Sequence, residues 1–338
     1  MRRHELVVIG AGSGNAVVAD SFADLDVAIV EERWFGGTCL NAGCIPSKMF
    51  AHTAHVARAV EDAGTYDVDA EPGGIRWRDA RDRIFRRLGA EREEGRRGRE
   101  AQDFVTVYEG RARFTGPRTL RIERSGTAPL DIGVAQVVIA AELAEVFAAA
   151  GSAVTIVEKE RRLLGPQDEA VSRRFTELVR SRHDLRLGRE LTALGASPGA
   201  LRLALDDGST VDADTLLVAV GRIPDSDRLD LGAAGIATHD DGRVIVDAHQ
   251  RTTAGSVYAL GDICSPVPLK HVANREAKVV AHNLRHPDDP IACDHDLVPA
   301  AVFTAGDRRP HAHRSPYWIH PALTEVVENA LLDLGPDP

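Results

Sequence analysis

The feature that most constrains this chain is a pair of cysteines, Cys39 and Cys44, within a glycine-rich segment. Two glycines stand directly before the pair, and a proline and Lys48 follow closely. The pattern predicts a helix that starts at a glycine-rich loop and carries both thiols near its N-terminal end, where the helix dipole favours thiolate. Thiols on one helical face at this spacing can form a strained, reducible disulfide. Two buried cysteines or half of a zinc site would show the same spacing, and the flanking sequence decides between these interpretations.

A second constraint lies at the start of the chain. The apolar run Leu6–Ile9 predicts a buried strand, and a glycine turn with the spacing of a dinucleotide-binding fingerprint follows it. We expect an alanine- and valine-rich helix next, with its N-terminus directed at a pyrophosphate. A second strand over 27–30 ends in Glu31, where an acidic residue binds a ribose hydroxyl. Asn15 replaces the last glycine of the fingerprint, whose other glycines are Gly10, Gly12 and Gly14.

Composition limits the class of protein. The chain has 338 residues, of which 43% are hydrophobic and 27% charged, and its net charge is −10. This length allows two or three domains with hydrophobic cores, and the acidic balance argues against nucleic acid or an anionic membrane as partner. A redox pair in a cysteine-poor chain without a leader or a membrane-spanning stretch predicts a cytoplasmic protein. The other cysteines, Cys264 and Cys293, stand singly, and no metal site is predicted.

The rest of the chain alternates between strand and helix patterns, which indicates an α/β fold. The helix over 79–103 carries many arginines and glutamates and is expected to be exposed. The strand over 257–260 ends in Gly261 and Asp262. Further strands are expected over 104–114, 120–122, 136–140 and 154–157, and further helices over 51–60, 141–150, 168–182 and 271–284.

Five segments resemble those of the flavin-dependent pyridine nucleotide–disulfide oxidoreductases, and together they extend over the length of the chain. These segments are GAGSGN (10–15), GGTCLNAGCIPSK (36–48), LLVAVGRIP (216–224), ALGD (259–262) and HPALTE (320–325). The cysteine segment is highly specific to this family. The resemblance implies a Rossmann-like FAD-binding domain, a truncated second nucleotide-binding domain and a remnant of an α+β dimerisation domain. The domains would comprise 1–140 with 221–296, then 141–220, then 297–338.

The resemblance also implies roles for single residues. Cys39 would attack a low-molecular-weight disulfide, Cys44 would be the thiolate against the flavin, and Lys48 would stabilise charge on the reduced ring. In a homodimer, His320, oriented by Glu325, would reach in from the other subunit and protonate the leaving thiolate. NADPH would supply the electrons. The residues implied to hold FAD are Gly10, Gly12, Gly14, Glu31, Gly37, Thr38, Lys48 and Asp262.

Two stretches depart from the family pattern. The strand over 136–140 runs directly into the helix over 141–150, so the first strand of the second domain and its glycine turn are missing. Some residues of that domain are kept, namely Glu142, Glu158, Arg161 and Arg162. After Thr304 the chain passes through 305–315 to the histidine segment, without the sheet and helix of a dimerisation domain. Both departures resemble internal deletions in a once complete enzyme or errors of gene prediction.

The sequence therefore leaves three functions open. The first is an FAD-dependent NAD(P)H:disulfide oxidoreductase that uses the Cys39–Cys44 disulfide. The second is an FAD-binding remnant of such an enzyme with impaired turnover or none. The third is a flavin oxidase or diaphorase that has lost its disulfide partner.

We expect NADPH to bind with a dissociation constant above about 1 mM, which is weaker than about −4 kcal/mol. A pyrophosphate site needs glycines that let backbone N–H groups converge, whereas residues 139–142 are Ile-Ala-Ala-Glu. Stopped-flow measurements should show slow reduction of the flavin by NADPH, while dithionite reduces the same flavin readily. Reduction that saturates at micromolar NADPH would contradict this prediction.

Overall fold

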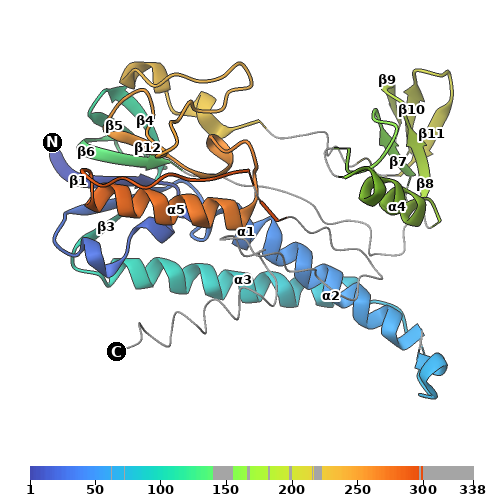
Figure 1. The fold of residues 1–338 in the computed structure, drawn as a ribbon. Coiled ribbons are helices and arrows are strands. Elements are labelled where there is room, and N and C mark those ends of the chain that lie inside the picture. The colour runs from blue at the N-terminus through green and yellow to red at the C-terminus, as the bar shows by residue number, and fades with distance from the viewer. Residues whose placement is uncertain are drawn as a thin grey trace. The chain divides into compact units, whose positions relative to one another are not determined.

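The computed structural model describes residues 1–139, 155–214, 216 and 223–299, except for 62, 72, 166–167, 182, 198–199 and 297. The chain divides into two compact units (Figure 1). Unit 1 comprises Met1–Val146 and Gly221–Pro338, and unit 2 comprises Phe147–Val220. The assignment of FAD and NAD(P) to particular parts of the chain stays a prediction.

The core of unit 1 is a seven-stranded sheet with a parallel centre. Strand β1 (Arg2–Ile9) pairs in parallel with β2 (Val27–Glu31) on one side and with β6 (Leu130–Ile139) on the other. Beyond β2 lies β3 (Val105–Glu109), and β12 (Val257–Ala259) pairs with the carboxyl-terminal end of β6, both in parallel. The predicted α/β fold with a Rossmann-like core is confirmed.

Two antiparallel strands, β4 (Arg111–Gly116) and β5 (Thr119–Glu123), join the amino-terminal end of β6. The sequence predicts one strand over 104–114, but the structure divides this segment into β3 and β4. The division falls at Gly110, which has φ +156°, and a Cβ there would lie 2.6 Å from the carbonyl oxygen of Glu123. A side chain at this position would therefore collide with the neighbouring strand.

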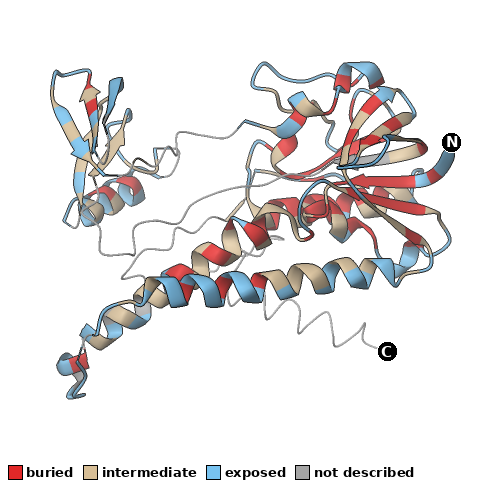
Figure 2. Ribbon diagram, turned by 180° about the vertical axis from the view of Figure 1, so that it is seen from behind, coloured by how far each residue is buried: buried red, intermediate tan, exposed pale blue. Residues whose placement is uncertain are grey.

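The apolar run of β1 is buried on both faces of the sheet. Leu6 and Val8 pack in a cluster with helix α5 (Lys270–Arg285), and Val7 packs on the opposite face in a cluster with Phe114. Figure 2 shows this burial along the central strands. Because successive side chains of a strand point to opposite faces, a strand covered on both sides reads as a continuous apolar run.

The two long helices of unit 1, α2 (Cys44–Glu61) and α3 (Trp77–Glu100), lie side by side (Figure 1). The predicted exposed helix over 79–103 is confirmed as α3. One stripe of α3 is nevertheless buried, formed by Ala80, Ile84 and Leu88. Its spacing of four residues places the stripe on one face of the helix, where Ile84 and Leu88 pack with Phe50 of α2.

The predicted alanine- and valine-rich helix after the glycine turn is wrong. In its place are two short 3-10 turns, η1 (Ser13–Val17) and η2 (Asp20–Phe22). The guanidinium of Arg99 in α3 donates to both the side-chain oxygen and the carbonyl oxygen of Asn15, each at 2.8 Å. A continuing α-helix would need that carbonyl for a backbone N–H four residues later. The residue that replaces the fingerprint glycine thus anchors the turn to α3.

Unit 2 contains a strand–helix–strand motif and a separate antiparallel sheet. Strands β7 (Thr155–Glu158) and β8 (Asp184–Leu187) pair in parallel, and α4 (Glu169–Arg180) connects them. The helix begins at Asp168, whose carboxylate accepts the N–H groups of the first turn. The antiparallel sheet consists of β9 (Leu191–Ser197), β10 (Ala200–Leu205) and β11 (Thr210–Ala213). The predicted helix over 141–150 lies outside the described residues.

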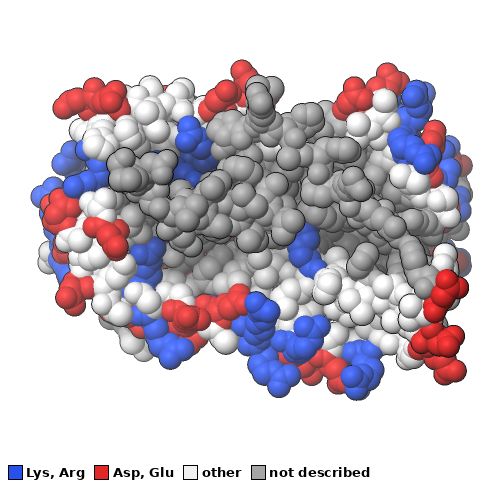
Figure 3. All heavy atoms as spheres, turned by 60° about the horizontal axis from the view of Figure 1, so that its bottom comes forward, with Lys and Arg blue, Asp and Glu red and all other residues white. Residues whose placement is uncertain are grey.

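The surface of the described residues carries charges of both signs. Figure 3 shows acidic and basic side chains interspersed along the visible edges of one face. Ion pairs account for part of this mixture on α3, where Arg87 pairs with Glu91 and Arg96 with Glu93. Among the described helices, none combines the length and the apolar character needed to cross a membrane.

Candidate functional site

The carboxyl ends of the parallel strands bring three predicted FAD-binding segments to one edge of the sheet. The glycine turn follows β1, and its first residue, Gly10, donates its N–H to the carbonyl of Val30 in β2 at 2.8 Å. Glu31 is the last residue of β2, and Gly261 with Asp262 begins the 3-10 turn η6 (Gly261–Ile263) after β12. Ligands of open parallel sheets bind at such an edge.

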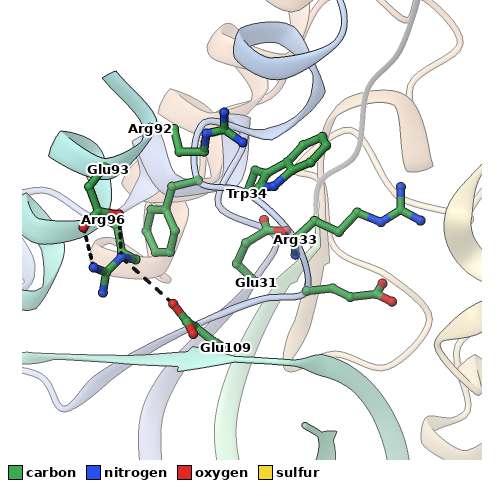
Figure 4. A pocket seen from close by; sticks show the side chains of 9 residues that line it. Glu31, Arg33, Trp34, Arg92, Glu93, Arg96 and Glu109 are labelled. Carbon is green, nitrogen blue, oxygen red and sulfur yellow. Dashed lines mark hydrogen bonds and ion pairs between the residues drawn. The ribbon is translucent and has the colours of Figure 1, made fainter. Parts of the chain in front are cut away.

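Glu31 borders a cavity of about 200 Å³ at this edge (Figure 4). One carboxylate oxygen of Glu31 accepts the N–H of Ala11 at 2.8 Å, and the other accepts the N–H of Arg33 at 2.8 Å. These bonds fix the carboxylate between the glycine turn and the end of β2. Each carboxylate oxygen can accept a further hydrogen bond, so Glu31 can still bind a ribose hydroxyl.

The walls of this cavity come from α3 and from the segment after β2. The guanidinium of Arg92 lies over the indole ring of Trp34, 5.0 Å from the ring centroid. Arg96 pairs with Glu93 and reaches Glu109 at the end of β3 (Figure 4). Its hydrogen bond holds the pKa of the Glu93 carboxyl below its ordinary value. The part of this wall that comes from α3 could not be predicted from the sequence, because that helix lies more than 50 positions after Glu31.

The two cysteines lie in separate helices, so the predicted single helix that carries both is wrong. Cys39 is in the short helix α1 (Gly37–Asn41), and Cys44 is the first residue of α2. The chain breaks at Ala42, with φ −146°, because Pro46 has no N–H to donate to the Ala42 carbonyl and its ring would clash there. Cys44 still lies at the N-terminus of an 18-residue helix, where the dipole favours thiolate.

A glycine allows the two cysteine-bearing segments to approach each other. A Cβ at Gly43 would lie 3.1 Å from the carbonyl oxygen of Thr38 and 3.5 Å from Cα of Cys39. Cys39 is buried and Cys44 is half-buried. No disulfide joins these cysteines in the structure, so the redox-active disulfide stays a prediction.

The cysteine segment is docked on the glycine turn through the backbone. Gly36 donates its N–H to the carbonyl of Ala11 at 2.9 Å. A Cβ at Gly37, which has φ +59°, would lie only 2.6 Å from Cα of Gly12. The buried side chain of Asn41 donates to the carbonyls of Phe35 and Gly37, each at 2.8 Å, and so holds this turn from the other side.

Two lysines lie close to these segments. Lys48 is one helical turn after Cys44 and borders a cavity of about 330 Å³ between α2 and α3. Lys270, which the sequence analysis did not single out, is the first residue of α5 and donates to the hydroxyl of Ser13 in the glycine turn at 2.9 Å. A lysine beside this turn can neutralise phosphate charge.

The remaining predicted residues fall into two groups. His320, Glu325 and Glu142 lie outside the described residues. Glu158 ends β7 in unit 2, and Arg162 of the same unit pairs with Glu169 at 3.0 Å. The glycine turn that the family places before this site is missing from the sequence, and the junction over 140–154 lies outside the described residues.

The residues at the sheet edge of unit 1 fit FAD. A side chain at Gly37 would collide with the backbone of Gly12, which leaves main chain facing the place of a pyrophosphate. Glu31 and Asp262 supply carboxylates at the ends of two strands of the same sheet. By contrast, the described residues of unit 2 include no glycine turn after a strand that would fit the pyrophosphate of NADPH.

Comparison with known proteins gives several relatives. A family profile described as pyridine nucleotide-disulphide oxidoreductase matches residues 4–128 and 137–277. The chain is 38% identical to mycothione reductase of Mycobacterium tuberculosis, covering 90% of this chain and 76% of that protein. It is 31% identical to dihydrolipoyl dehydrogenase of Halobacterium salinarum, with coverages of 89% and 73%. The alignment to mycothione reductase spans 352 residues, more than the 338 of this chain, so an internal part of that protein has no counterpart here.

A solved structure shows the same fold. The Cu(II) complex of the HOCl-induced flavoprotein disulfide reductase RclA from Escherichia coli matches with a TM-score of 0.73. The match covers 84% of this chain and 71% of that one at 21% sequence identity. At this identity the likeness concerns the fold alone.

We expect Gly37→Ala to lower the free energy of unfolding of unit 1 by at least about 2 kcal/mol, because the new Cβ would meet the Gly12 backbone at a positive φ. Urea unfolding followed by tryptophan fluorescence measures this, since Trp34 and Trp77 lie in unit 1. The control is Gly95→Ala within α3, where a Cβ meets nothing within 4 Å. That variant should gain about 0.5–1 kcal/mol, and equal stability of the two variants would contradict the close contact.

Glu31→Ala should weaken FAD binding by roughly 1–3 kcal/mol, the cost of a lost hydrogen bond to a charged group. Titration of the apoprotein with FAD measures the effect. Glu5→Ala is the matched control, because the Glu5 carboxylate also accepts a backbone N–H, that of Asp26 at 2.9 Å, but at the amino end of the same strands. An equal loss of affinity in both variants would contradict a role of Glu31 in the site.

Proposed function

This chain belongs to the pyridine nucleotide-disulphide oxidoreductase family, and on that premise we propose that it is an FAD-dependent NAD(P)H:disulfide oxidoreductase. Its substrate is a low-molecular-weight disulfide, which it reduces through Cys39 and Cys44. The 38% identity to mycothione reductase supports mycothione as that disulfide. The 31% identity to dihydrolipoyl dehydrogenase makes a dihydrolipoamide dehydrogenase-like activity the second candidate.

The observation that carries the proposal is the docking of the cysteine segment on the glycine turn. The bond from Gly36 to Ala11 and the contact between Gly37 and Gly12 hold the start of α1 against the predicted pyrophosphate site. Cys39 lies two residues after Gly37, so one rigid piece of backbone carries both the nucleotide turn and a thiol. A redox pair needs this proximity to a bound nucleotide cofactor, whereas a structural cysteine does not.

The chemistry of the dithiol follows from thiol–disulfide exchange. Bound FAD would supply the two electrons from NAD(P)H that reduce the Cys39–Cys44 disulfide. The Cys39 thiolate then attacks one sulfur of the substrate disulfide, forms a mixed disulfide and displaces the first thiolate, which takes a proton. The Cys44 thiolate attacks the sulfur of Cys39, releases the second thiol after protonation and restores the internal disulfide. One substrate disulfide becomes two thiols, with two electrons and two protons consumed.

The residues around the two cysteines support these separate roles for Cys39 and Cys44. The position of Cys44 at the N-terminus of α2 favours its thiolate, and Lys48 adds positive charge one helical turn further on. Cys39 is buried in α1, the helix that starts at Gly37. The acid that protonates the leaving thiolates is His320 with Glu325, supplied across a homodimer in a reducing cytoplasm.

An FAD-binding remnant with impaired turnover is the competing function. The missing glycine turn at 139–142 favours it, as does the internal part of mycothione reductase that has no counterpart in this chain. The absorption spectrum of the purified protein separates the two functions. A yellow protein whose flavin is bleached by anaerobic NADPH supports the enzyme, and a yellow protein that only dithionite bleaches supports the remnant.

Cys44→Ser should abolish the long-wavelength absorbance of a thiolate against the flavin, whereas Cys39→Ser should leave it visible. The reason is that Cys39→Ser prevents the disulfide but keeps the Cys44 thiolate at its helix N-terminus. Absorption spectra of the FAD-loaded variants measure this difference.

Cys264→Ser is the control for these spectra, since it removes another buried cysteine of unit 1. Chemical reduction of the Cys264→Ser variant should expose the two thiols of Cys39 and Cys44, which reoxidise together as in the unaltered chain. Complete alkylation of both Cys39 and Cys44 in air-oxidised protein would contradict the redox pair.

A further inference from the structure

A buried polar cluster that the proposed reaction does not use lies behind the turn of Gly261. Glu276 of α5 is fully buried, and one of its carboxylate oxygens accepts the Gly261 N–H at 2.6 Å. The other oxygen lies 2.8 Å from Nε2 of His295, and Sγ of Cys293 lies 3.7 Å from the same nitrogen. The three groups bring an oxygen, a nitrogen and a sulfur within 4.8 Å of one another.

The backbone that presents these side chains is firmly held. Asn283 of α5 is buried, and its side chain both donates to the Ile291 carbonyl at 2.9 Å and accepts the Ile291 N–H at 2.8 Å. Two residues later, Cys293 donates its N–H to the carbonyl of Ala248 at 2.8 Å. The segment is therefore fixed to α5 before any ligand binds, which lowers the cost of assembling a site.

The cluster requires positive charge. A carboxylate without contact to water is costly unless a cation or several donors compensate it, and Glu276 has one backbone donor besides His295. The imidazole of His295 and the sulfur of Cys293 lie beside this carboxylate, so a cation bound among the three groups would offset its charge.

We propose that Glu276, Cys293 and His295 form a binding site for a divalent transition metal, of which Zn²⁺ fits best. Zinc prefers thiolate sulfur, imidazole nitrogen and carboxylate oxygen, and this cluster offers one of each. A carboxylate and a thiolate carry two negative charges, which the ion neutralises. Metal binding of this kind displaces the proton on the imidazole.

The nitrogen–sulfur distance fits a tetrahedral ion. With zinc at about 2.1 Å from nitrogen and 2.3 Å from sulfur, these two atoms stand about 3.6 Å apart, and His295 Nε2 lies 3.7 Å from Cys293 Sγ. The 2.8 Å contact between His295 and Glu276 is a hydrogen bond and would lengthen by about 0.5 Å on metal binding. The His295 side chain is 24% exposed, so a water molecule can reach the fourth position.

The site would stiffen the turn that precedes Asp262. The carboxylate oxygen of Glu276 that does not face the metal accepts the Gly261 N–H. Gly261 would therefore hold a ligand of the ion in place without touching the ion itself. Metal binding itself does not depend on the proposed reductase activity. Cys264 lies on the same turn, but its sulfur contacts the side-chain oxygen of Gln250 and the carbonyl of Gly261.

The test uses the full chain with Cys39→Ser and Cys44→Ser, which removes the other thiol pair able to bind zinc. Equilibrium dialysis against zinc chloride, followed by elemental analysis, should give one bound zinc per chain. Adding Cys293→Ser should weaken zinc binding at least about tenfold. Loss of a residue that only hydrogen-bonds to a metal ligand already lowers affinity by about that factor, and Cys293 would be a ligand itself. Adding Cys264→Ser, the matched control, should leave binding unchanged.

Zinc X-ray absorption of the same chain gives a readout that does not depend on further variants or their folding. One sulfur at about 2.3 Å, with the other ligands nitrogen or oxygen at about 2.0–2.2 Å, is expected. Absence of bound zinc would overturn the proposal and leave Glu276 and His295 as a buried ion pair. A spectrum without sulfur, affinity unaffected by Cys293→Ser, or equal losses with Cys264→Ser would also overturn it.

Discussion

The backbone contact between Gly12 and Gly37 is the constraint on which the candidate site depends. It brings the nucleotide turn after β1 and the start of the cysteine segment close enough that a Cβ at Gly37 would lie 2.6 Å from Cα of Gly12. The bond from Gly36 to Ala11 and the clamp formed by Asn41 then fix the direction in which α1 leaves the turn. Because Gly43 permits a second close approach, Cys44 begins α2 beside the same piece of backbone. Small residues therefore allow the close approach of the two segments that carry the thiols.

The parallel core could be predicted because its signals are local. The apolar run of β1, the acidic end of β2 and the Gly261 turn after β12 each follow from a strand pattern and the residues that end it. Parallel pairing then places the three carboxyl ends at one edge without any further information. Helix α3 could be predicted for a similar reason, since its charged residues leave only the narrow stripe around Ile84 for burial.

The rest depends on contacts between residues far apart in the sequence. Asn15 looks like a minor replacement within the fingerprint, yet Arg99, 84 positions later, bonds both its side chain and its carbonyl in the 3-10 turn that stands in place of the expected helix. The cavity wall at Glu31 likewise comes from arginines of α3. The break between α1 and α2 is an exception, because its cause, Pro46, is local. The spacing of the two cysteines predicts one helix, whereas Pro46 predicts a break before it. Local propensity thus failed where side chains from a distant element contact the turn or the cavity.

The cluster at Glu276 could not be predicted from the sequence. Zinc sites are recognised by two pairs of ligands at fixed spacing, and Cys293 with His295 forms a single pair. Only the docking of residues 291–295 on α5 adds the third group, and the same docking connects the cluster to Gly261. This connection has a physical consequence for the candidate site. Gly261 adopts φ +75°, a conformation that glycine reaches without strain because it has no Cβ. The Glu276 carboxylate holds the Gly261 N–H, and its own charge is balanced from the opposite side by His295. The position of Asp262 at the sheet edge is therefore linked to the ion pair between Glu276 of α5 and His295, which involves neither Cys39 nor Cys44 of the proposed exchange.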